Sequence, residues 1–427
     1  MNDIANVLPK ETETVRRIFD QWKARGDSQP VRGYLGASII GHECERYLWF
    51  CYRQCCKHEF SGRMYRLFET GQLEEDRFST DLQSIGVEVH ATDPDGKQWE
   101  VSFLGGHFSG HMDGAGLGIP EAPKSWHVLE YKTHNDKSFV KLKKDGVRVA
   151  KPMHYMQTQL YMHGTGLTRA LYLAKNKNDD DLYSERIHYD KEVAEGLVER
   201  AKRIITATEP PSRLSDRADF WQCKYCDART ICHNDGKVKA LPVLTLSCRH
   251  CCHATPDLEG TAAQWQCDKH NRALSPQDQG RCCSDHLCLP GLFSFDEPKE
   301  FEDDTITFGG GWKHGKNGLS SRELMSASIP EVTSGMVSEA RERFGAEIVA
   351  SNCVLDRYPS EDSRIIWQGP AEGLTAAWAA QGWADLKKLK QLDRCDCLDH
   401  AAAEYDSGRV AIFWRDRKQA EIRMGVE

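Results

Sequence analysis

The stretch from Trp126 to Thr133, with the sequence WHVLEYKT, constrains the fold more than any other part of the chain. Its apolar residues surround one carboxylate, Glu130, and one amine, Lys132, two positions apart. Side chains on a β-strand alternate between its two faces, so residues i and i+2 point the same way. We therefore expect Glu130 and Lys132 to project together from one edge of a sheet, as an ion pair or as part of a metal site.

Polar residues that would join this pair lie on both sides of it in the sequence. Asp113 stands seventeen residues before Glu130, in the segment SGHMDG, which predicts a turn between two short strands. Two strands joined by that turn would bring Asp113 beside Glu130. Gln157 and Tyr161 are four residues apart in a segment with helical spacing, so they share one face of the predicted helix.

Another segment, FETGQLEEDRF, places Glu75 four residues after Gly71 on a helix predicted over residues 64–85. In their order and spacing, these elements together resemble the PD-(D/E)XK nuclease superfamily. More narrowly, they resemble the RecB-type exonucleases, which include CRISPR-associated and phage-encoded members. The resemblance covers residues 30–236 of the chain. It departs from the family at Glu75, where many relatives carry His, and Glu74 competes for the same role.

This resemblance implies an α/β fold with a restriction-endonuclease-like core, in which a central mixed β-sheet is flanked by helices. It also implies a Mg²⁺- or Mn²⁺-dependent deoxyribonuclease, with exonuclease action in DNA end processing or recombination favoured over endonuclease action. The implied catalytic residues are Glu75, Asp113, Glu130, Lys132, Gln157 and Tyr161. The implied metal ligands are Glu75, Asp113, Glu130 and the carbonyl of Tyr131. Lys132 would position a water molecule, and Gln157 and Tyr161 would fix the substrate strand.

Cysteine usage is the second strong signal, because the chain has 17 cysteines. In a cytoplasmic protein, such a number favours metal ligation over disulfides. Residues 33–53 resemble the N-terminal helix of nucleases that hold a 4Fe–4S cluster with one early and three late cysteines. The implied cluster ligands are Cys44, Cys223, Cys226 and Cys232, and Zn²⁺ is the chemical rival at the same four thiolates.

The remaining early cysteines have a simpler interpretation. We expect Cys51, Cys55 and Cys56 to be packing residues, with Cys51 as a substitute cluster ligand. The alternative for the four implied ligands is that they are buried and bind no metal.

Residues 237–295 predict a small zinc-binding module. They contain Cys248-x2-Cys251 and Cys267-x2-His270, and so many soft ligands in a short segment are typical of a zinc ribbon or knuckle. A tetrahedral site would supply folding energy that so small a core cannot. We favour as Zn²⁺ ligands Cys248, Cys251, Cys267 and Cys283, with His270 and His286 as alternates. A second site would draw on Cys252, His253, Cys282 or Cys288.

Composition is that of an ordinary soluble protein, with 40% hydrophobic and 28% charged residues. No apolar run reaches the length of a membrane span, and the N-terminus lacks the apolar core of a signal peptide. We therefore expect a protein of the bacterial or phage-infected host cytoplasm, without membrane contact. Most of the net charge of −8 arises beyond residue 236, so the nuclease-like part can still carry a local basic groove.

The expected partner is DNA, as single strands or duplex ends, together with a recombination or single-strand-binding protein. Phosphate contacts are predicted for basic residues that follow the acid cluster, with a solvated loop as the alternative. These residues are Lys141, Lys143, Lys144, Arg148, Lys151, Lys175 and Lys177. The rival interpretation is a non-catalytic nucleic-acid-binding or partner-docking protein built on a nuclease fold. The complete acid set with Lys132 argues against it.

We predict four segments along the chain. They are a nuclease domain with its metal staple (1–236), the Cys/His module (237–295), an acidic Gly-rich linker (296–319) and a C-terminal α+β domain of unknown role (320–427). Within the last segment, the patterns predict helices over residues 329–345 and 373–392 and a strand over residues 408–416. The cysteines Cys353, Cys395 and Cys397 also lie there, and no motif is recognised.

Overall fold

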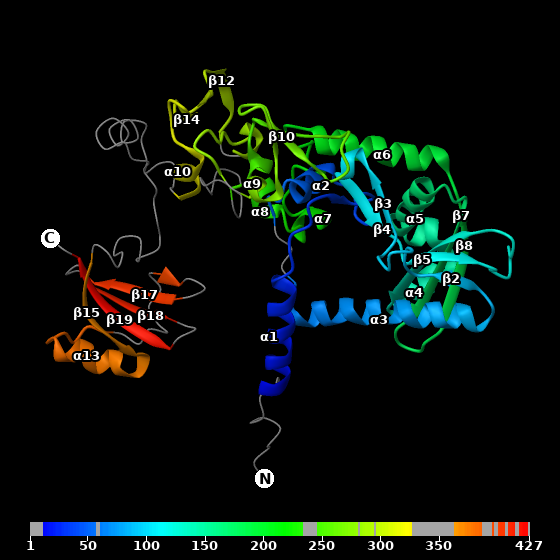
Figure 1. Cartoon of the computed structure of the whole chain (residues 1–427), viewed down its shortest axis with the longest axis horizontal. Coiled ribbons are helices and arrows are strands. Elements are labelled where there is room, and N and C mark those ends of the chain that lie inside the picture. Colours follow the sequence, from blue (N-terminus) through cyan, green and yellow to red (C-terminus); the bar gives the residue numbers. More distant parts are fainter. Residues whose placement is uncertain are drawn as a thin grey trace, which may run out of the picture. The chain divides into compact units, whose positions relative to one another are not determined.

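The computed structural model describes residues 12–56, 60–233, 246–280, 282–293, 296–326, 363–386, 395–396, 400–405, 409–414 and 418–425. The chain separates into two compact units, Met1–Asn317 and Gly318–Glu427. Figure 1 traces the helices and strands of both units.

The first unit contains a five-stranded mixed sheet with the strand order β2-β5-β6-β7-β8. Its strands are β2 (Glu88–His90), β5 (Gly114–Leu117), β6 (His127–His134), β7 (Arg169–Asn176) and β8 (Leu182–His188). β6 and β7 are parallel, while the other neighbours are antiparallel. Parallel neighbours need a long crossover, here through two helices. The strand predicted over residues 126–133 is confirmed as β6, and the chain is a mixed α/β protein.

Helices cover both faces of this sheet. α3 (Gly62–Ser84), which confirms the helix predicted over residues 64–85, contacts β6 and β2. Its residues Phe78 and Leu82 join Leu129 and Tyr131 of β6 in one hydrophobic core cluster. α5 (Pro152–Thr165) contacts β6 and β7, and α4 (Asp136–Ala150) contacts β7, β8 and α5. Figure 1 labels β2, β5, β7 and β8 of this sheet near helices α4 and α5. The alternation of β6 therefore turns residues 129 and 131 toward α3 and residues 130 and 132 toward the opposite face.

The amphipathic segment after β8 forms α6 (Lys191–Thr206), as its pattern predicts, and α6 contacts α5 and α2. The Asp190 side chain caps its first turn by accepting a hydrogen bond from Val193 N at 3.3 Å. The cysteine-bearing helices α7 (Trp221–Lys224) and α8 (Arg229–Cys232) follow.

The N-terminal segment differs from the long helix expected over residues 33–53. After α1 (Glu13–Asp27), the chain forms β1 (Leu35–Gly36), and α2 spans only Glu45–Tyr52. β1 pairs with β4 (Phe108–His111) in a small sheet that also contains β3 (Glu100–Phe103), and the short helix η2 (Leu104–Gly106) joins β3 to β4. Residues 35–37 cannot be helical because their backbone is used in this sheet, where Leu35 N donates to His107 O at 2.9 Å.

Residues 246–317 complete the first unit with two small antiparallel sheets. One contains β9 (Ala254–Pro256), β10 (Trp265–Cys267) and β11 (Arg272–Leu274), and the other contains β12 (Pro298–Glu302), β13 (Thr305–Phe308) and β14 (Lys313–Gly315). The short helices η3 (Cys248–His250), α9 (Pro276–Gln279) and η4 (Pro290–Leu292) lie between these strands in the sequence.

The prediction that residues 296–319 form a linker is wrong for β12–β14. Buried Ile306 and Phe308 alternate along β13, and the ring of Phe308 stacks on Trp312 at 3.9 Å between centroids. The acidic and glycine residues that suggested a linker lie in the turns and on the exposed strand β12. An apolar alternation within a polar segment is enough to bury one face of a small sheet.

The second unit contains a five-stranded sheet in the order β15-β19-β18-β17-β16, with antiparallel neighbours. Its elements are α10 (Ser321–Ser326), β15 (Ser363–Pro370), η5 (Ala371–Gly373), α13 (Leu374–Ala380), β16 (Cys395–Asp396), β17 (His400–Tyr405), β18 (Arg409–Trp414) and β19 (Gln419–Gly425). β18 and α13 match the predicted strand and the start of the helix predicted over residues 373–392. The helix predicted over residues 329–345 lies outside the described residues, as do Cys353 and Cys397.

Among the helices that the structure describes, none combines the length and apolar character that a membrane span requires.

Candidate functional site

Strand β6 presents Glu130 and Lys132 on one face, as the period-two spacing predicts. Glu130 is fully buried, and its carboxylate forms an ion pair with the Lys132 ammonium. Lys132 Nζ also donates to Tyr131 O at 2.9 Å and lies 4.0 Å from Asp113 Oδ2. The Lys132 ammonium therefore lies beside two carboxylates and one carbonyl of the candidate site.

Asp113 reaches this site from the turn between β4 and β5. Its Oδ2 accepts a hydrogen bond from Tyr131 N at 2.6 Å, which fixes the carboxylate against the backbone of β6. The turn can come this close because the next residue is Gly114, with φ +154°, where an added Cβ would lie 2.9 Å from His90 O. Asp113 and Glu130 therefore lie together around Lys132, as expected from the turn predicted in the SGHMDG segment.

Helix α3 brings Glu75, and not Glu74, toward these groups. Burial, and then the neighbouring Asp113 charge, raise the pKa of Glu75 to about 7. Glu74 points elsewhere, because it forms ion pairs with Lys175 at 2.8 Å and with Arg77 at 3.6 Å. Consecutive helical residues differ by about 100° in direction, so only one of the two can face the acid cluster. The structure thus favours Glu75 of the two alternatives left open by the sequence.

We call Glu75, Asp113, Glu130 and Lys132 the acid cluster. Burial raises the pKa of both Asp113 and Glu130, and the charges of Asp113 and Glu75 raise that of Glu130 further, against the opposing Lys132. Burial lowers the pKa of Lys132, but the negative charges of Glu130 and Asp113 raise it by more, so that the net shift is upward. Among the described residues, Glu130 Oε2 is buried with no hydrogen-bond partner. Three carboxyls around one ammonium leave excess negative charge that a divalent cation would neutralise.

Gln157 and Tyr161 share one face of α5, but their side chains are buried instead of exposed to a substrate. Gln157 Nε2 donates to the Tyr161 hydroxyl at 2.8 Å, and that hydroxyl donates to His111 O at 2.6 Å. His111 ends β4 and lies two residues before Asp113. The pair therefore fixes the backbone that carries Asp113, which is a positioning role.

A buried polar network that the sequence did not predict lies beside Lys132. The Tyr172 hydroxyl of β7 lies 2.9 Å from His134 Nε2 and 2.8 Å from His154 Nδ1. Burial, and then the Lys151 charge, lower the pKa of His134 to about 4, while burial and Lys132 lower that of His154 to about 3. Both rings are therefore neutral at pH 7. His134 continues the period-two spacing of Glu130 and Lys132, and that signal could have found it.

The predicted DNA-contacting cations are not equally available. Lys175 is buried in ion pairs with Glu74 and Asp180, and exposed Lys143 pairs with Asp181 at 2.8 Å. The Lys151 ammonium donates to the Ser138 hydroxyl. The remaining predicted cations are exposed on α4 or just after β7, namely Lys141, Lys144, Arg148 and Lys177. The basic run is thus mostly helix α4, in place of the solvated loop considered as its alternative.

The four cysteines of the implied cluster site line one cavity, together with Tyr47 and Phe50. Cys44 caps α2, where its Sγ accepts a hydrogen bond from Tyr47 N at 3.4 Å. Burial, and more weakly Cys44 and Cys232, raise the pKa of Cys226 to about 11. The fold thus brings Cys44 to the distant cysteines Cys223, Cys226 and Cys232. Nearby, Cys55 is buried, and Cys51 Sγ lies 4.0 Å from Cys56 Sγ.

The later cysteines and histidines divide between two places. Cys283 Sγ lies 3.9 Å from His270 Nε2, and burial, Cys283 and Cys267 together raise the pKa of Cys248 to about 11. Elsewhere, Cys288 Sγ lies 3.9 Å from His286 Nδ1.

No group of three or more His, Cys, Asp or Glu side chains in the described part of the chain is already arranged to hold a metal ion. The acid cluster, the cysteines around Cys44 and the cysteines of residues 246–293 are all included in this statement.

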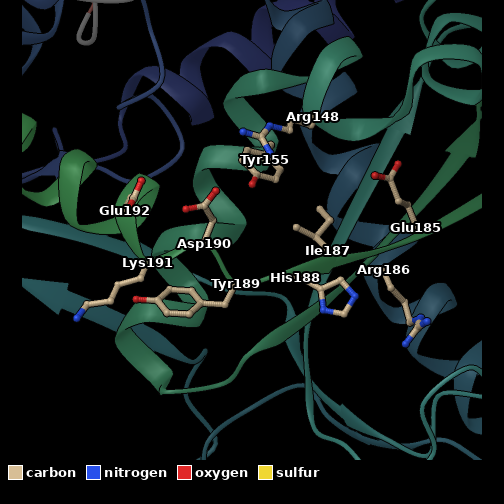
Figure 2. A pocket seen from close by; sticks show the side chains of 10 residues that line it. All are labelled: Arg148, Tyr155, Glu185, Arg186, Ile187, His188, Tyr189, Asp190, Lys191 and Glu192. Atoms are coloured by element: carbon tan, nitrogen blue, oxygen red, sulfur yellow. The ribbon is translucent and has the colours of Figure 1, made fainter.

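An open pocket of about 540 Å³ is lined by none of the acid-cluster residues (Figure 2). In it, the Arg148 guanidinium lies 5.1 Å from the centre of the Tyr155 ring. Its lining contains as many acidic as basic side chains, namely Glu185, Asp190 and Glu192 against Arg148, Arg186 and Lys191. The pocket therefore has no net charge to select an anion or a cation.

Comparisons with known proteins give only distant structural similarity. No protein-family model matches the chain, and no curated protein matches it. The protein SSO0001 aligns at 15% identity and a TM-score of 0.33, over 52% of this chain and 96% of its own. An alkaline exonuclease from Laribacter hongkongensis aligns at 15% identity and a TM-score of 0.29, over 43% of this chain and 90% of its own. A phage-related exonuclease from Haemophilus somnus 129PT aligns at 13% identity and a TM-score of 0.24, over 32% of this chain and 68% of its own. Scores this low do not establish a family.

Proposed function

We propose that this chain is a divalent-metal-dependent deoxyribonuclease whose active site is the acid cluster. One observation carries the proposal: a strand and a turn place two buried carboxyls beside one half-buried ammonium, and the charges of Asp113 and Lys132 also act on Glu75 of helix α3. Structural ion pairs usually match charges in number, and an excess of buried acid costs stability unless a cation compensates it. Such a cost is typical of functional sites.

Mg²⁺ or Mn²⁺ fits this donor set, because both ions prefer carboxylate oxygens. Asp113, Glu130 and Glu75 would hold the ion. Among the described residues, Glu130 Oε2 has no hydrogen-bond partner and is therefore available as a metal ligand. The Tyr131 carbonyl accepts a hydrogen bond from Lys132 and has a second lone pair with which it would join the ligand set. A bound ion would polarise the scissile phosphate and lower the pKa of a water molecule.

The protein's own groups would do the positioning. Lys132 would hold the attacking water and offset the negative charge that develops on the phosphate as one P–O bond forms and another breaks. Gln157 and Tyr161 would keep Asp113 in place through His111 O. Phosphates of the DNA backbone would contact the exposed cations Lys141, Lys144, Arg148 and Lys177. The sequence resemblance favours exonuclease action in end processing or recombination.

We further propose that Cys44, Cys223, Cys226 and Cys232 bind a structural metal centre, either a 4Fe–4S cluster or Zn²⁺. Four thiols that line one cavity support the proposal. A centre there would tie the first turn of α2 to α7 and α8 across a long stretch of sequence. None of the four cysteines belongs to the acid cluster, so the centre would stabilise the fold without taking part in catalysis.

The decisive experiment is cleavage of end-labelled linear and circular DNA, with and without Mn²⁺, by anaerobically purified full-length protein. We expect metal-dependent cleavage that falls at least about a hundredfold in Asp113→Asn, Glu130→Gln and Lys132→Met. The first two changes weaken the metal site, and the third removes the positive charge that offsets the charge on the phosphate. Resistance of circular DNA would support exonuclease action.

The matched control is Glu74→Gln, which changes the acid next to Glu75 that pairs with Lys175. It should retain cleavage within a few-fold. DNA binding without any metal-dependent cleavage by the wild type would instead favour a non-catalytic binding protein. Full activity in Lys132→Met would reject the active-site assignment.

A further inference from the structure

The hairpin β10–β11 places two soft ligands close together in residues 246–293. Cys267 ends β10, and His270 lies in the turn before Arg272, the cross-strand partner of Cys267. The His270 Nε2 atom contacts Cys283 Sγ at 3.9 Å. A strand-end cysteine and a turn histidine three residues later are typical of a zinc knuckle.

Cys248 reaches the same region from η3. Its Sγ donates to Asp278 O at 3.6 Å, in the helix α9 that leads on to Cys283. That helix is fixed by a capping box between Ser275 and Asp278, and Arg272 pairs with Asp278 at 3.0 Å. Helix α9 contacts both η3 and β11, so one short helix brings the segment of Cys248 beside the hairpin that carries Cys267 and His270.

The other candidate ligands are engaged elsewhere. Cys251 is buried, its Sγ accepts a hydrogen bond from Leu287 N at 3.5 Å, and it forms a β-bridge with Cys288. His286 Nε2 lies 2.9 Å from Ser247 O, and its Nδ1 faces Cys288 Sγ. The side chains of Cys251 and His286 thus contact Leu287, Ser247 and Cys288, although His286 N donates to Cys283 O at 3.3 Å.

We propose that Cys248, Cys267, His270 and Cys283 together bind one Zn²⁺ ion. Three thiolates and one imidazole are a common structural zinc set. This assignment does not depend on the nuclease proposal, and it replaces Cys251 of the tetrad predicted from the sequence with His270. The four side chains are not yet closed around one point. A cysteine Sγ moves by roughly 3 Å between staggered rotamers, so metal binding here would require side-chain rotation.

One acidic neighbour also faces the site. Asp285 Oδ2 lies 3.4 Å from His270 Nε2. Metal-bound histidines commonly donate their second ring N–H to a carboxylate, which fixes the ring and raises its basicity. After rotation of the ring, Asp285 would take that role.

The zinc ion would anchor this segment to the central fold. Arg249 follows Cys248 directly, and its guanidinium donates to Tyr52 O at 3.1 Å and to Gly33 O at 2.8 Å. Trp265, two residues before Cys267, stacks on the Tyr52 ring at 5.8 Å. Two of the four ligands are thus next to the residues that dock on α2, so metal loss would loosen this docking.

The test is zinc analysis of the full-length protein, made in metal-defined medium with Zn²⁺. We expect Cys267→Ser, Cys283→Ser and His270→Ala each to hold about one Zn²⁺ fewer per chain than the wild type. The matched controls are Cys282→Ser, adjacent to a proposed ligand, and Cys251→Ser, the ligand favoured by sequence alone. Both controls should keep the wild-type zinc content.

Cobalt replacement gives a second readout that does not depend on quantitative zinc retention. His270→Cys should retain the metal and, with Co²⁺, increase the sulfur-to-metal charge-transfer absorption of this site by about one-third, because four thiolates replace three. Loss of zinc in Cys251→Ser with retention in His270→Ala would overturn the proposed tetrad. Equal zinc content in the wild type and in all the proposed-ligand variants would overturn the site itself.

Discussion

Glu75 is the residue at which proton binding and metal binding should compete. Its pKa is raised to about 7 by burial and by Asp113, whereas an unfolded chain would have a value near 4.5. The folded metal-free protein therefore binds a proton more tightly than the unfolded chain between these two values. By linkage, the stability contribution of Glu75 is greatest at low pH and is lost as pH rises through about 7.

We predict that Glu75→Gln removes this dependence in metal-free protein. At pH 8 the variant should be more stable than the wild type, by at most about 3 kcal/mol, and the difference should shrink toward pH 5. Urea unfolding in the presence of a chelator, at pH 5 and pH 8, measures this difference in the free energy of unfolding. Adding Mn²⁺ at pH 8 should stabilise the wild type more than the variant, because the cation offsets the carboxylate charge. Glu74→Gln is the control, and an equal pH response in both variants would contradict the assignment of Glu75 to the cluster.

At the scale of elements, the cysteine cavity joins α2 to α7 and α8. If a metal centre fills it, losing one ligand should release these short helices, at a cost of a few kcal/mol or more by analogy with other structural metals and cross-links. We predict that anaerobic wild-type protein is brown and absorbs near about 400 nm. Cys226→Ser should lose the colour and melt at a lower temperature.

Cys51→Ser is the control for this prediction, since Cys51 faces Cys56 and does not line the cavity. It should retain both the colour and the melting temperature. Colourless wild-type protein with stoichiometric zinc at these cysteines would reject the cluster but retain the metal link. Wild-type protein with neither iron nor zinc would reject both.

At the scale of the whole molecule, the division after Asn317 predicts where the chain can be shortened. A chain ending at residue 317 should fold and keep the metal-dependent cleavage of the full protein. A chain ending at residue 295 should be less stable, because β12–β14 complete the first unit. There His314 Nε2 accepts a hydrogen bond from Cys288 N at 2.9 Å, and Phe308 packs on Phe293 at 5.0 Å.

Thermal unfolding and DNA cleavage by the two shortened chains test this division. Equal stability of both would mean that residues 296–317 act as the linker expected from their composition. Loss of folding in the chain ending at 317 would show that the first unit depends on the second.

The sequence by itself determined strand β6, the turn that carries Asp113 and the helices α3, α5 and α6, because their periodicity is local, whereas the basic run of α4 was not predicted as a helix. Alternation in WHVLEYKT specified β6, and helical spacing specified α3, α5 and α6. It also placed Asp113, Glu130 and Lys132 on elements that a single turn can bring together. Short strands with few apolar residues were not predicted. An example is β13, whose alternating Ile306 and Phe308 lie between acidic and glycine-rich turns.

Only the tertiary structure decided what depends on contacts between distant segments. It distinguished Glu75 from Glu74, since both fit the same helix and only packing chooses which one faces Asp113. It buried Tyr161 against His111 O and joined Tyr172 to two histidines from separate elements. It also gathered Cys44 with cysteines 179 to 188 residues later in the chain. Sequence periodicity specifies the face of each element, whereas the partner on that face is set by how the elements pack in three dimensions.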